Sequence, residues 1–400
     1  MAKYFVFFLH DFLPKANVPA SVLIINCANA AANLGYPAVM VYFRKGLEVF
    51  NPISWIYPFH PRKPHKDLIG FYSIQEKLRE VALPMPLAVD RCFLGRISPA
   101  LLTSRYYFPI HILPHTKLLC TRHWEFVKIA VNLGVPVIFE YDHWIEKQFE
   151  PEIVNNPLLK VAVTVAEPLR KNMIEYGMPA EKIIKSHNGI NKAFLIRYPD
   201  GAAQWRRQLL SQKYKYLAVY AGALVRWKGI DMLVDVARVL PQVEFVLAGG
   251  EPPQIDYYQK LASEKSADNV KFLGYVPHDK LISLYQAADV LVYPHLFSEA
   301  STFTSPMKFF EYLASGSPIV ATEIGPLMEF KSSNLAIGWC EKDNPNAFAK
   351  TIERVLTDYP RRDDGYSENI EFSKQFSWEN RIIKVLSRVD ESLRLSLLEE

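Results

Sequence analysis

The sequence predicts two doubly wound α/β domains, each built on a parallel sheet with helices on both faces. The chain has 400 residues, more than one hydrophobic core usually holds. Short apolar runs recur without polar alternation, which is typical of strands buried on both faces of a parallel sheet. The alternation of strand and helix stops in a polar stretch near residues 195–213 and then starts again. Together these observations favour two similar domains in tandem.

The first domain is expected at residues 1–195 and begins with an apolar strand at 3–10. A loop containing proline follows, and small residues then predict a helix from about Ser21 to Leu34. Further strands are expected where bounded apolar runs occur, at Ala38–Tyr42, Lys117–Cys120, Val135–Glu140 and Val161–Val165.

The second domain is expected at residues 214–378, after a turn at Asn188-Gly189 and a linker at 196–213. The last segment, 379–400, is amphipathic, and we expect one helix that begins at Trp378 and crosses back to the first domain. Strands of the second domain are expected at Tyr216–Tyr220, Val243–Ala248, Val270–Leu273, Val290–Val292 and Pro318–Ala321.

The composition excludes several classes of protein. Half of the residues are hydrophobic and 22% are charged, which excludes a disordered chain. No apolar run approaches the ~18 residues of a membrane span, and the first strand is too short for a signal-peptide core. The cysteines form no CxxC pair, which excludes a disulfide framework and a cysteine zinc site. We therefore expect a cytoplasmic protein, with scattered cysteines at Cys27, Cys92, Cys120 and Cys340.

The charge is unevenly divided between the two halves. The net charge of +4 is too small to indicate a nucleic-acid binder. Residues 1–195 carry 22 Lys+Arg and 15 Asp+Glu, a net of +7, while the rest carry 24 and 27, a net of −3. Aromatic and basic residues mix at Pro58–Lys66, with Trp55, Phe71 and Tyr72 nearby. Either this segment is a solvated loop, or the first domain docks on an anionic membrane or binds a charged acceptor.

One helix start carries the clearest chemical signal. Ser305 is a good N-cap and Pro306 a good first helical residue, and Gly316 ends the helix. The unpaired N–H groups and positive dipole of such a helix start can hold a phosphate. Glu311 follows at a spacing that suits hydrogen bonds to ribose hydroxyls. The alternative is an ordinary capped helix with a surface ion pair between Lys308 and Glu311.

A strand, a glycine turn and a helix follow one another at residues 219–231. Gly222 permits close approach of the backbone, and Arg226 and Lys228 supply cations suited to a diphosphate. The alternative is a solvated loop. At the end of a later strand, the backbone of Tyr275 and Val276 lies where open α/β sheets bind ligands, and could contact a nucleotide base.

Five segments between residues 222 and 330 resemble, in order and spacing, the C-terminal half of the GT-B glycosyltransferases of family 4. They are "GALVRWKGIDML", "VEFVLAGG", "VKFLGYVP", "LYQAADVLVYP" and "SPMKFFEYLASGSPIVATEIGPLMEF". The first half is similar more loosely, through "CTRHWEF", "VPVIFEYDHW" and "SHNGINKAF". The resemblance implies the GT-B fold, in which two Rossmann-like domains face a cleft.

The resemblance also implies an activity and roles for particular residues. Members of the family are retaining, metal-independent transferases that use a nucleotide-diphosphate sugar, linked to UDP or GDP, and no further cofactor. The lysine that matches Lys228 neutralises the diphosphate, and the glutamate that matches Glu311 hydrogen-bonds the ribose. The helix start that matches Ser305, Pro306, Met307 and Lys308 holds phosphate through backbone amides.

The sequence departs from the family pattern at two positions. The family arginine corresponds to Ala223, so that Arg226 is a displaced substitute. The family glutamate that contacts the transferred sugar corresponds to Phe303, and Glu299 is the nearby acid that could replace it. The identity of the donor sugar therefore stays open.

The expected mechanism needs no strong protein base. Breaking the bond between the anomeric carbon and phosphate builds charge on the diphosphate, which Lys228, Arg226 and the helix dipole stabilise. A front-face attack lets that phosphate accept the proton of the acceptor. The absence of an Asp-x-Asp triplet agrees with a site without metal.

Polar residues that follow strands of the first domain are the expected acceptor-side residues. His143 could contact the sugar or acceptor, with Glu140 orienting it, and Arg122 could contact the acceptor. Paired loop residues are the alternative for all three. His10 and Asn17 could also line the cleft.

Two other functions remain as alternatives. A non-hydrolysing nucleotide-sugar epimerase shares this fold but needs carboxylate acid and base residues at the sugar. A sugar-nucleotide-binding regulator without catalysis would fit the departure at Phe303. A dehydrogenase is excluded because no GxGxxG follows the first strand.

Overall fold

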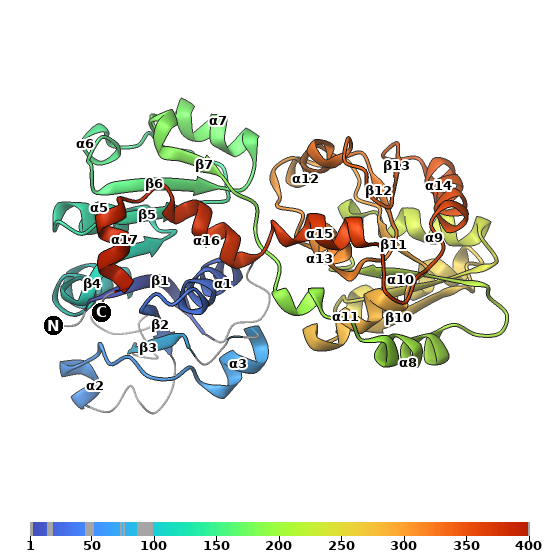
Figure 1. Ribbon diagram of the computed structural model, residues 1–400, viewed down its shortest axis with the longest axis horizontal. Helices are drawn as coiled ribbons and strands as arrows, with labels where there is room; N and C mark the ends of the chain where they lie inside the picture. The colour runs from blue at the N-terminus through green and yellow to red at the C-terminus, as the bar shows by residue number, and fades with distance from the viewer. Residues whose placement is uncertain are drawn as a thin grey trace. The chain divides into compact units, whose positions relative to one another are not determined.

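The chain folds into two units in a computed structural model that describes residues 3–13, 19–44, 52–72, 74, 77–85 and 99–398. The first unit consists of Met1–Asn188 together with Trp378–Glu400, and the second of Gly189–Ser377. Each unit has a single parallel sheet with helices on both of its faces (Figure 1). The predicted α/β fold class is thereby confirmed.

The first sheet has seven strands in the order β3-β2-β1-β4-β5-β6-β7. Every neighbouring pair is parallel, and Val6 of β1 lies opposite Val39 of β2. On one face Phe8 packs against Phe108 and Phe126, with ring centroids 4.9 and 4.8 Å apart. The strands are β1 (Tyr4–Phe12), β2 (Ala38–Arg44), β3 (Arg79–Pro84), β4 (Thr116–Thr121), β5 (Val137–Glu140), β6 (Leu159–Thr164) and β7 (Ile183–Lys185).

Helices and single turns connect these strands. The helix α1 packs against β1 and β2, and α5 packs against β4 and β5. None of the helices in the described ranges combines the length and the apolar composition needed to cross a membrane. The elements are α1 (Pro19–Asn33), α2 (Pro52–Ile56), α3 (Lys66–Tyr72), α4 (Pro99–Leu102), η2 (Thr103–Ile112), η3 (Leu113–His115), α5 (Trp124–Asn132), α6 (Pro151–Val154), α7 (Glu167–Glu175) and η4 (Ala180–Lys182).

The end of the chain returns to the first unit, as expected, but as two helices and not one. They are α16 (Trp378–Leu386) and α17 (Glu391–Leu398). The chain turns between them at Asp390, whose carboxylate binds Lys160 Nζ at 2.6 Å and whose carbonyl accepts from the Arg394 N–H at 3.0 Å. Asp390 thus starts a new helix where the sequence pattern predicted a continuous one.

A buried ion pair ties α16 to the first sheet. The Arg381 guanidinium donates to both oxygens of Glu140, at 2.7 and 2.8 Å, and both side chains are almost fully buried. The same guanidinium donates to the His187 carbonyl at 3.1 Å and contacts the Cys27 sulfur at 3.3 Å. The helix α16 also packs against α1 (Figure 1). The last turns of the chain therefore complete the fold of the first unit.

The second sheet has six parallel strands in the order β10-β9-β8-β11-β12-β13. Alternate residues of β8 enter two separate hydrophobic clusters: Leu217 and Val219 pack on one face, and Ala218 and Tyr220 on the other. This burial on both faces explains the continuous apolar runs of the sequence. The strands are β8 (Tyr216–Ala221), β9 (Val243–Ala248), β10 (Val270–Gly274), β11 (Val290–Tyr293), β12 (Ile319–Thr322) and β13 (Ile337–Cys340).

Residues 196–213, the expected linker, hold α8 within the second unit. This helix packs against α11; Trp205 Nε1 donates to Ser283 Oγ at 3.1 Å, and Arg206 binds Asp289 at 2.9 Å. The elements of the unit are η5 (Lys192–Leu195), α8 (Pro199–Leu209), η6 (Arg226–Lys228), α9 (Ile230–Val239), α10 (Pro252–Glu264), α11 (His278–Ala287), α12 (Glu299–Phe303), α13 (Met307–Ser315), η7 (Gly325–Phe330), α14 (Pro345–Asp358) and α15 (Ser367–Lys374).

Each sheet has one place where the order of its strands reverses. In the first sheet the chain builds β1, β2 and β3 outward in one direction and then continues on the other side of β1 with β4. In the second sheet the same reversal lies between β8 and β11. The loops at the carboxyl ends of such strands diverge and leave room for a ligand. A ligand site is therefore expected at these two positions.

Replacing Arg381 with Met should destabilise the first unit by about 3–5 kcal/mol, because the Glu140 carboxylate would stay buried without its partner. The measurement is urea unfolding of the full chain, followed through the transition of the first unit. Arg170→Met is the matched control, since Arg170 forms an exposed pair with Glu167, and it should cost about 1 kcal/mol or less. Equal losses in the two variants would contradict a structural role for the buried pair.

Candidate active site

The loop after β8 holds the predicted lysine at the strand reversal of the second sheet. Gly229 has a φ of +76°, and a Cβ on it would lie 1.9 Å from the Pro294 carbonyl oxygen. The Leu296 N–H also donates to the Trp227 carbonyl at 2.9 Å. The short turn η6, which carries Lys228, therefore packs closely against the segment that follows β11.

Two ammonium groups lie close together at this position. Burial, and then the positive charge of Lys308, lower the pKa of Lys228 to about 8. The Nζ atom of Lys228 lies 5.3 Å from the centroid of the Trp227 ring, and among the described side chains no carboxylate pairs with it. An anion bound next to Lys228, which is half-buried and lies beside a second cation, would stabilise the charged form of this lysine.

The helix that supplies Lys308 begins one residue later than expected. α13 has Pro306, not Ser305, as its N-cap, and no side chain caps it. The Met307 N–H donates to the Ser305 carbonyl at 2.9 Å. The helix ends at Gly316, which has a φ of +71°, as predicted. The positive end of the α13 dipole still lies at Met307 and Lys308, near Lys228 of the β8 loop.

Glu311 is buried and belongs to a network. Its side chain is 5% exposed, and Oε2 accepts hydrogen bonds from Lys308 Nζ at 2.7 Å and from Tyr285 Oη at 3.1 Å. Burial, and then the charge of Glu311, raise the pKa of Tyr285 well above its ordinary value, so that Tyr285 remains a donor. The pair with Lys308 that the sequence suggested does form, but its acid is inside the protein. Its role toward a ribose stays a prediction.

Glycines from three strand ends meet beside this network. The Gly222 N–H donates to the Ala248 carbonyl at 2.9 Å, and the Gly249 N–H donates to the Gly274 carbonyl at 2.6 Å. A Cβ on Gly249 would lie 2.1 Å from the Gly222 carbonyl oxygen, so only glycine fits there. The sequence analysis singled out Gly222 and missed Gly249, whose signal was the pair of glycines directly after a buried strand.

The other predicted donor residues lie around this centre. Arg226 is exposed, and its charge acts on Tyr258 of α10. Tyr275 is 69% exposed, whereas Val276 is buried. The structure thus brings Lys228, Lys308 and Glu311 near one another, while the side chain of Arg226 is exposed.

Two positions of α12 were considered for contact with the transferred sugar. Glu299 begins α12, and its side chain lies outside what the structure describes. Phe303, which occupies the position of the family glutamate, ends the same helix. Their roles stay predictions.

His295 is a residue that the sequence analysis missed. It lies two residues after the end of β11, and its side chain is buried with only 6% of the residue exposed. Its ring centroid lies 3.9 Å from that of Tyr293 and 5.3 Å from that of Trp227. The signal was available, since a histidine follows a buried strand at the edge where ligands bind.

The reversal in the first sheet also gathers polar groups. Arg122 and His123 follow β4, and the Arg122 Nη2 donates to Asp142 Oδ1 at 3.0 Å. His143 Nδ1 lies 2.7 Å from the same oxygen. The rings of His10 and His123 are 5.7 Å apart, and burial, followed by the charges of His10 and Arg122, lowers the pKa of His123 to about 4. This cluster combines a fixed cation with a neutral imidazole.

The structure changes the interpretation of Glu140. Both of its oxygens bind Arg381, and the carboxylate that contacts His143 is that of Asp142. Glu140 was expected to orient His143 because it ends the preceding strand, but its side chain points into the core. The loop salt bridge considered for Arg122 does form. Asn17 lies outside the described residues.

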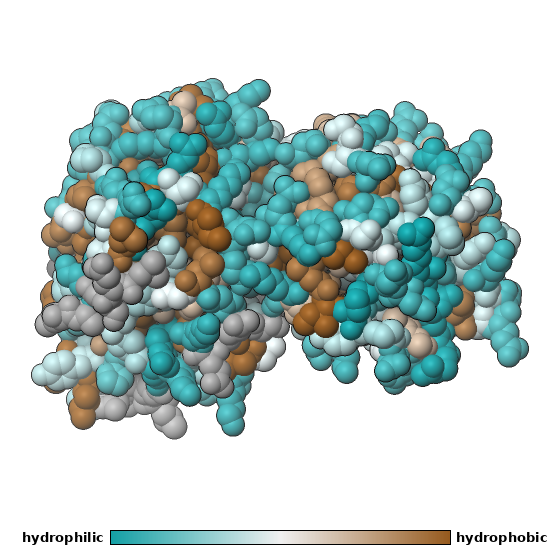
Figure 2. Space-filling model, viewed as in Figure 1, coloured by the Kyte–Doolittle hydropathy of each residue, from teal (hydrophilic) through white to brown (hydrophobic). Residues whose placement is uncertain are grey.

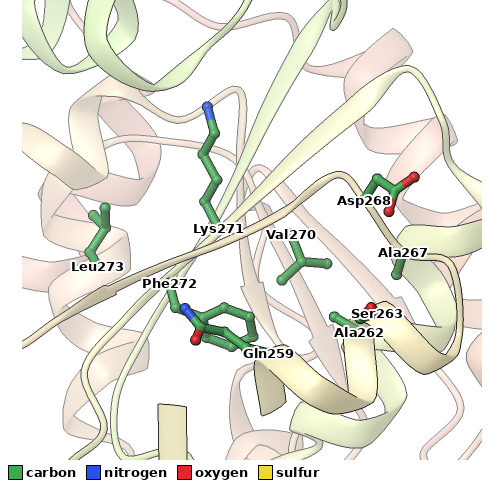
Figure 3. Close-up of a pocket in the computed structure, with 9 residues that line it drawn as sticks. All are labelled: Gln259, Ala262, Ser263, Ala267, Asp268, Val270, Lys271, Phe272 and Leu273. Carbon is green, nitrogen blue, oxygen red and sulfur yellow. The ribbon is translucent and has the colours of Figure 1, made fainter. Parts of the chain in front are cut away.

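A separate cavity of about 460 Å³ lies between α10 and the edge strand β10 (Figure 3). Gln259 lies beside Phe272 there, while Lys271 extends away from them. Lys271 binds Glu244 at 2.5 Å, and no residue predicted for the site lines this cavity. It plays no part in the arrangement described above.

Comparisons with known proteins agree with the fold, and part of the second unit matches a known protein family. Residues 202–371 match the family described as "Glycosyl transferases group 1". An uncharacterized glycosyltransferase of Methanocaldococcus jannaschii is 28% identical over 234 residues, which cover 54% of this chain and 56% of that protein. The D-inositol 3-phosphate glycosyltransferase of Corynebacterium aurimucosum is 26% identical over 240 residues, covering 57% and 56%. The chain thus spans about half the length of these curated relatives.

A solved structure is similar over nearly the whole chain. The Anabaena protein Alr3699/HepE, in complex with UDP and glucose, superposes with a TM-score of 0.66 at 16% identity. The match covers 96% of this chain and 99% of that one. At this identity the likeness establishes the two-domain fold.

The affinity of the second unit for inorganic pyrophosphate should fall about tenfold between pH 7 and pH 9. Lys228 is charged below its pKa of about 8 and loses its charge above it, so the anion loses a partner as the pH rises. Calorimetric titration of the full chain across this range measures the effect. Lys228→Arg should bind with little dependence on pH, because the guanidinium stays charged. The same pH profile in both proteins would assign the titration to another group.

Proposed function

We propose that this protein, whose residues 202–371 match the group 1 glycosyltransferases, transfers a hexose from a nucleotide-diphosphate sugar to a hydroxyl group with retention of configuration. The observation that carries the proposal is the convergence of Lys228, Lys308 and the start of α13 at the strand reversal of the second sheet. The acceptor is a saccharide, a lipid or a small molecule.

The diphosphate of the donor binds between Lys228 and the first turn of α13. Lys228 carries no carboxylate partner among the described side chains, so its charge is available to the anion. The backbone amide of Lys308 adds a hydrogen bond, and the start of α13 adds the helix dipole. Glu311, held by Lys308 and Tyr285, accepts hydrogen bonds from the ribose. The Anabaena protein of the same fold binds UDP and glucose, which supports a UDP-linked donor.

The chemistry follows from where charge develops. The bond between the anomeric carbon and the phosphate oxygen breaks, and the electron pair leaves with the diphosphate. Lys228 and the α13 dipole stabilise that charge more strongly in the transition state than in the bound donor. The acceptor oxygen forms the new bond on the same face, and its proton passes to the departing phosphate. Arg226, which is exposed, adds a cation at the rim.

The acceptor binds at the strand reversal of the first sheet. Arg122, fixed by Asp142, offers its Nη1 atom, which is buried without a hydrogen-bond partner. His123 offers a neutral imidazole, and His143 is oriented by Asp142. These donors and acceptors suit a hydroxylated molecule, and they favour a transferase over a protein that only isomerises its donor.

An apolar platform on the first unit suits a peripheral position at the cytoplasmic face of an anionic membrane. α2 buries none of its residues, and Ile53, Ile56 and Tyr57 are 68, 58 and 72% exposed. Figure 2 shows this hydrophobic patch over α2, at the lower left. The basic segment at 58–66 follows it directly, although its Arg62 binds the buried Glu80 at 3.3 Å. Apolar side chains beside basic ones are typical of interfacial segments.

Lys228→Ala should reduce kcat by about a hundredfold or more, because the leaving diphosphate loses a cation in a buried site. Glu311→Ala should also reduce kcat/KM strongly, mainly by raising the KM for the donor. The measurement is release of nucleoside diphosphate from a panel of UDP- and GDP-sugars, with thermal unfolding as a check on the fold. Lys331→Ala, at an exposed ion pair of the same unit, is the control.

Full activity in both variants would show that the donor site is misplaced. Nucleotide binding by the wild-type protein without any turnover, including slow hydrolysis of the donor, would instead support a sugar-nucleotide-binding regulator.

The double variant Ile53→Glu/Ile56→Glu should no longer sediment with vesicles of equal phosphatidylglycerol and phosphatidylcholine at low salt, because both exposed side chains would carry charge at the lipid surface. Leu133→Glu, at an exposed apolar residue elsewhere in the first unit, is the control and should sediment like the wild type. Wild-type protein that stays in the supernatant at low salt would contradict membrane docking.

A further inference from the structure

We propose that His295 is a further donor-site residue: it donates a hydrogen bond to a phosphate oxygen of the bound nucleotide and takes up a proton when that anion binds. The proposal rests on the proposed function, since it adds a contact to the same nucleotide site. The argument starts from the position of this residue in the fold.

His295 lies where the second sheet reverses its strand order. The loop after β8 carries Lys228, and the segment after β11 carries His295. β8 and β11 are direct neighbours, with Ala218 opposite Val290 and Val219 opposite Leu291. The two residues therefore come from adjacent strand ends on the edge of the sheet where ligands bind in this class of fold.

The segment that carries His295 is held rigidly. Thr322 Oγ1 donates to the His295 carbonyl at 2.6 Å, and the neighbouring Leu296 N–H donates to the Trp227 carbonyl at 2.9 Å. The imidazole itself lies between the rings of Tyr293 and Trp227. The side chain is therefore placed by contacts that do not use its nitrogens.

The imidazole nitrogen has no partner. His295 Nδ1 is fully buried and makes no hydrogen bond, and the residue as a whole is only 6% exposed. Leaving a buried polar atom unpaired costs about 1–3 kcal/mol. A histidine kept only for packing would be replaced by an aromatic side chain without that cost. The unpaired nitrogen thus indicates a partner that is present only when the site is filled.

The charges around His295 identify the partner as an anion. Burial, and then the charge of Lys228, lower the pKa of His295 well below its usual range. The titratable groups that face it are Lys228 from η6 and Tyr293 from β11. The charge of Lys308 acts on Lys228. The imidazole is therefore neutral in the free protein and next to cations. Bound phosphate would reverse that field and favour the imidazolium.

The proton balance separates His295 from Lys228. Lys228, with a pKa of about 8, is already charged at pH 6.5, so anion binding at this pH adds almost no proton to it. His295 is neutral there and can gain a proton from solvent. Proton uptake near pH 6.5 therefore reports on the histidine, and affinity for the nucleotide should rise as the pH falls.

The test is calorimetric titration of the full chain with UDP and with GDP at pH 6.5, in two buffers of different ionisation enthalpy. The dependence of the heat on the buffer gives the protons taken up, and the contribution of the nucleotide itself cancels between variants. His295→Phe keeps the ring contacts but has no nitrogen, and His295→Asn keeps a hydrogen-bonding group near the Nδ1 position but does not titrate. His115→Phe, in the first unit, is the control.

The wild type should take up more protons than either variant, by up to one per nucleotide. His295→Phe should weaken binding about tenfold, and His295→Asn should weaken it less while losing the same proton uptake. Thermal unfolding without nucleotide should be cooperative in all four proteins, with His295→Phe at least as stable as the wild type, which excludes loss of the fold. Wild-type affinity and proton uptake in His295→Phe, or wild-type proton uptake in His295→Asn, would overturn the proposal. Failure of the wild type to bind either nucleotide would remove the proposed function, and this inference with it.

Discussion

The reversal of strand order in each sheet is the constraint on which the arrangement of chemical groups depends. Because β8 and β11 are neighbours whose connections leave in opposite directions, their loops separate and expose the carboxyl ends of both strands. Lys228 and His295 come from these two ends, and Arg122 comes from the corresponding position in the first sheet. The hydrophobic strands bear no functional groups of their own, but their order determines which loops can act together.

The donor side illustrates that local geometry outweighs overall charge. The half of the chain with a net charge of −3 contains the proposed site for an anion. Three of its buried acids are paired with other residues and not with Lys228. Glu311 is bound by Lys308 and Tyr285, Glu244 by Lys271, and Asp289 by Arg206. Lys228 has no such partner among the described side chains. The field at one strand end is thus positive although this half of the chain is negative overall, since exposed charges farther away are screened by solvent.

The first unit uses a similar set of residue types for two different purposes. Glu140 and Asp142 are two residues apart at the end of β5, yet Glu140 binds Arg381 in the core while Asp142 binds Arg122 and His143 near the surface. Residues two apart in one strand would point to the same face, but β5 ends at Glu140 and Asp142 belongs to the loop that follows. The end of the strand thus separates a structural acid from a candidate functional one. The pair with Arg381 also gives the end of the chain a structural role, because α16 completes the packing on α1.

The sequence alone determined the two α/β units and the glycine turn at Gly222, and it singled out Lys228, Lys308 and Glu311 as candidate site residues, because burial periodicity and helix-end chemistry are local properties of a chain. Which side chains meet was decided only by the tertiary structure. The turn at Asp390, the partner of Glu140 and the buried position of His295 all depend on contacts between residues far apart in sequence. A histidine after a strand has the same local sequence whether its nitrogen finds a partner or stays unpaired beside a lysine. Only the packing of β11 against the β8 loop distinguishes the two.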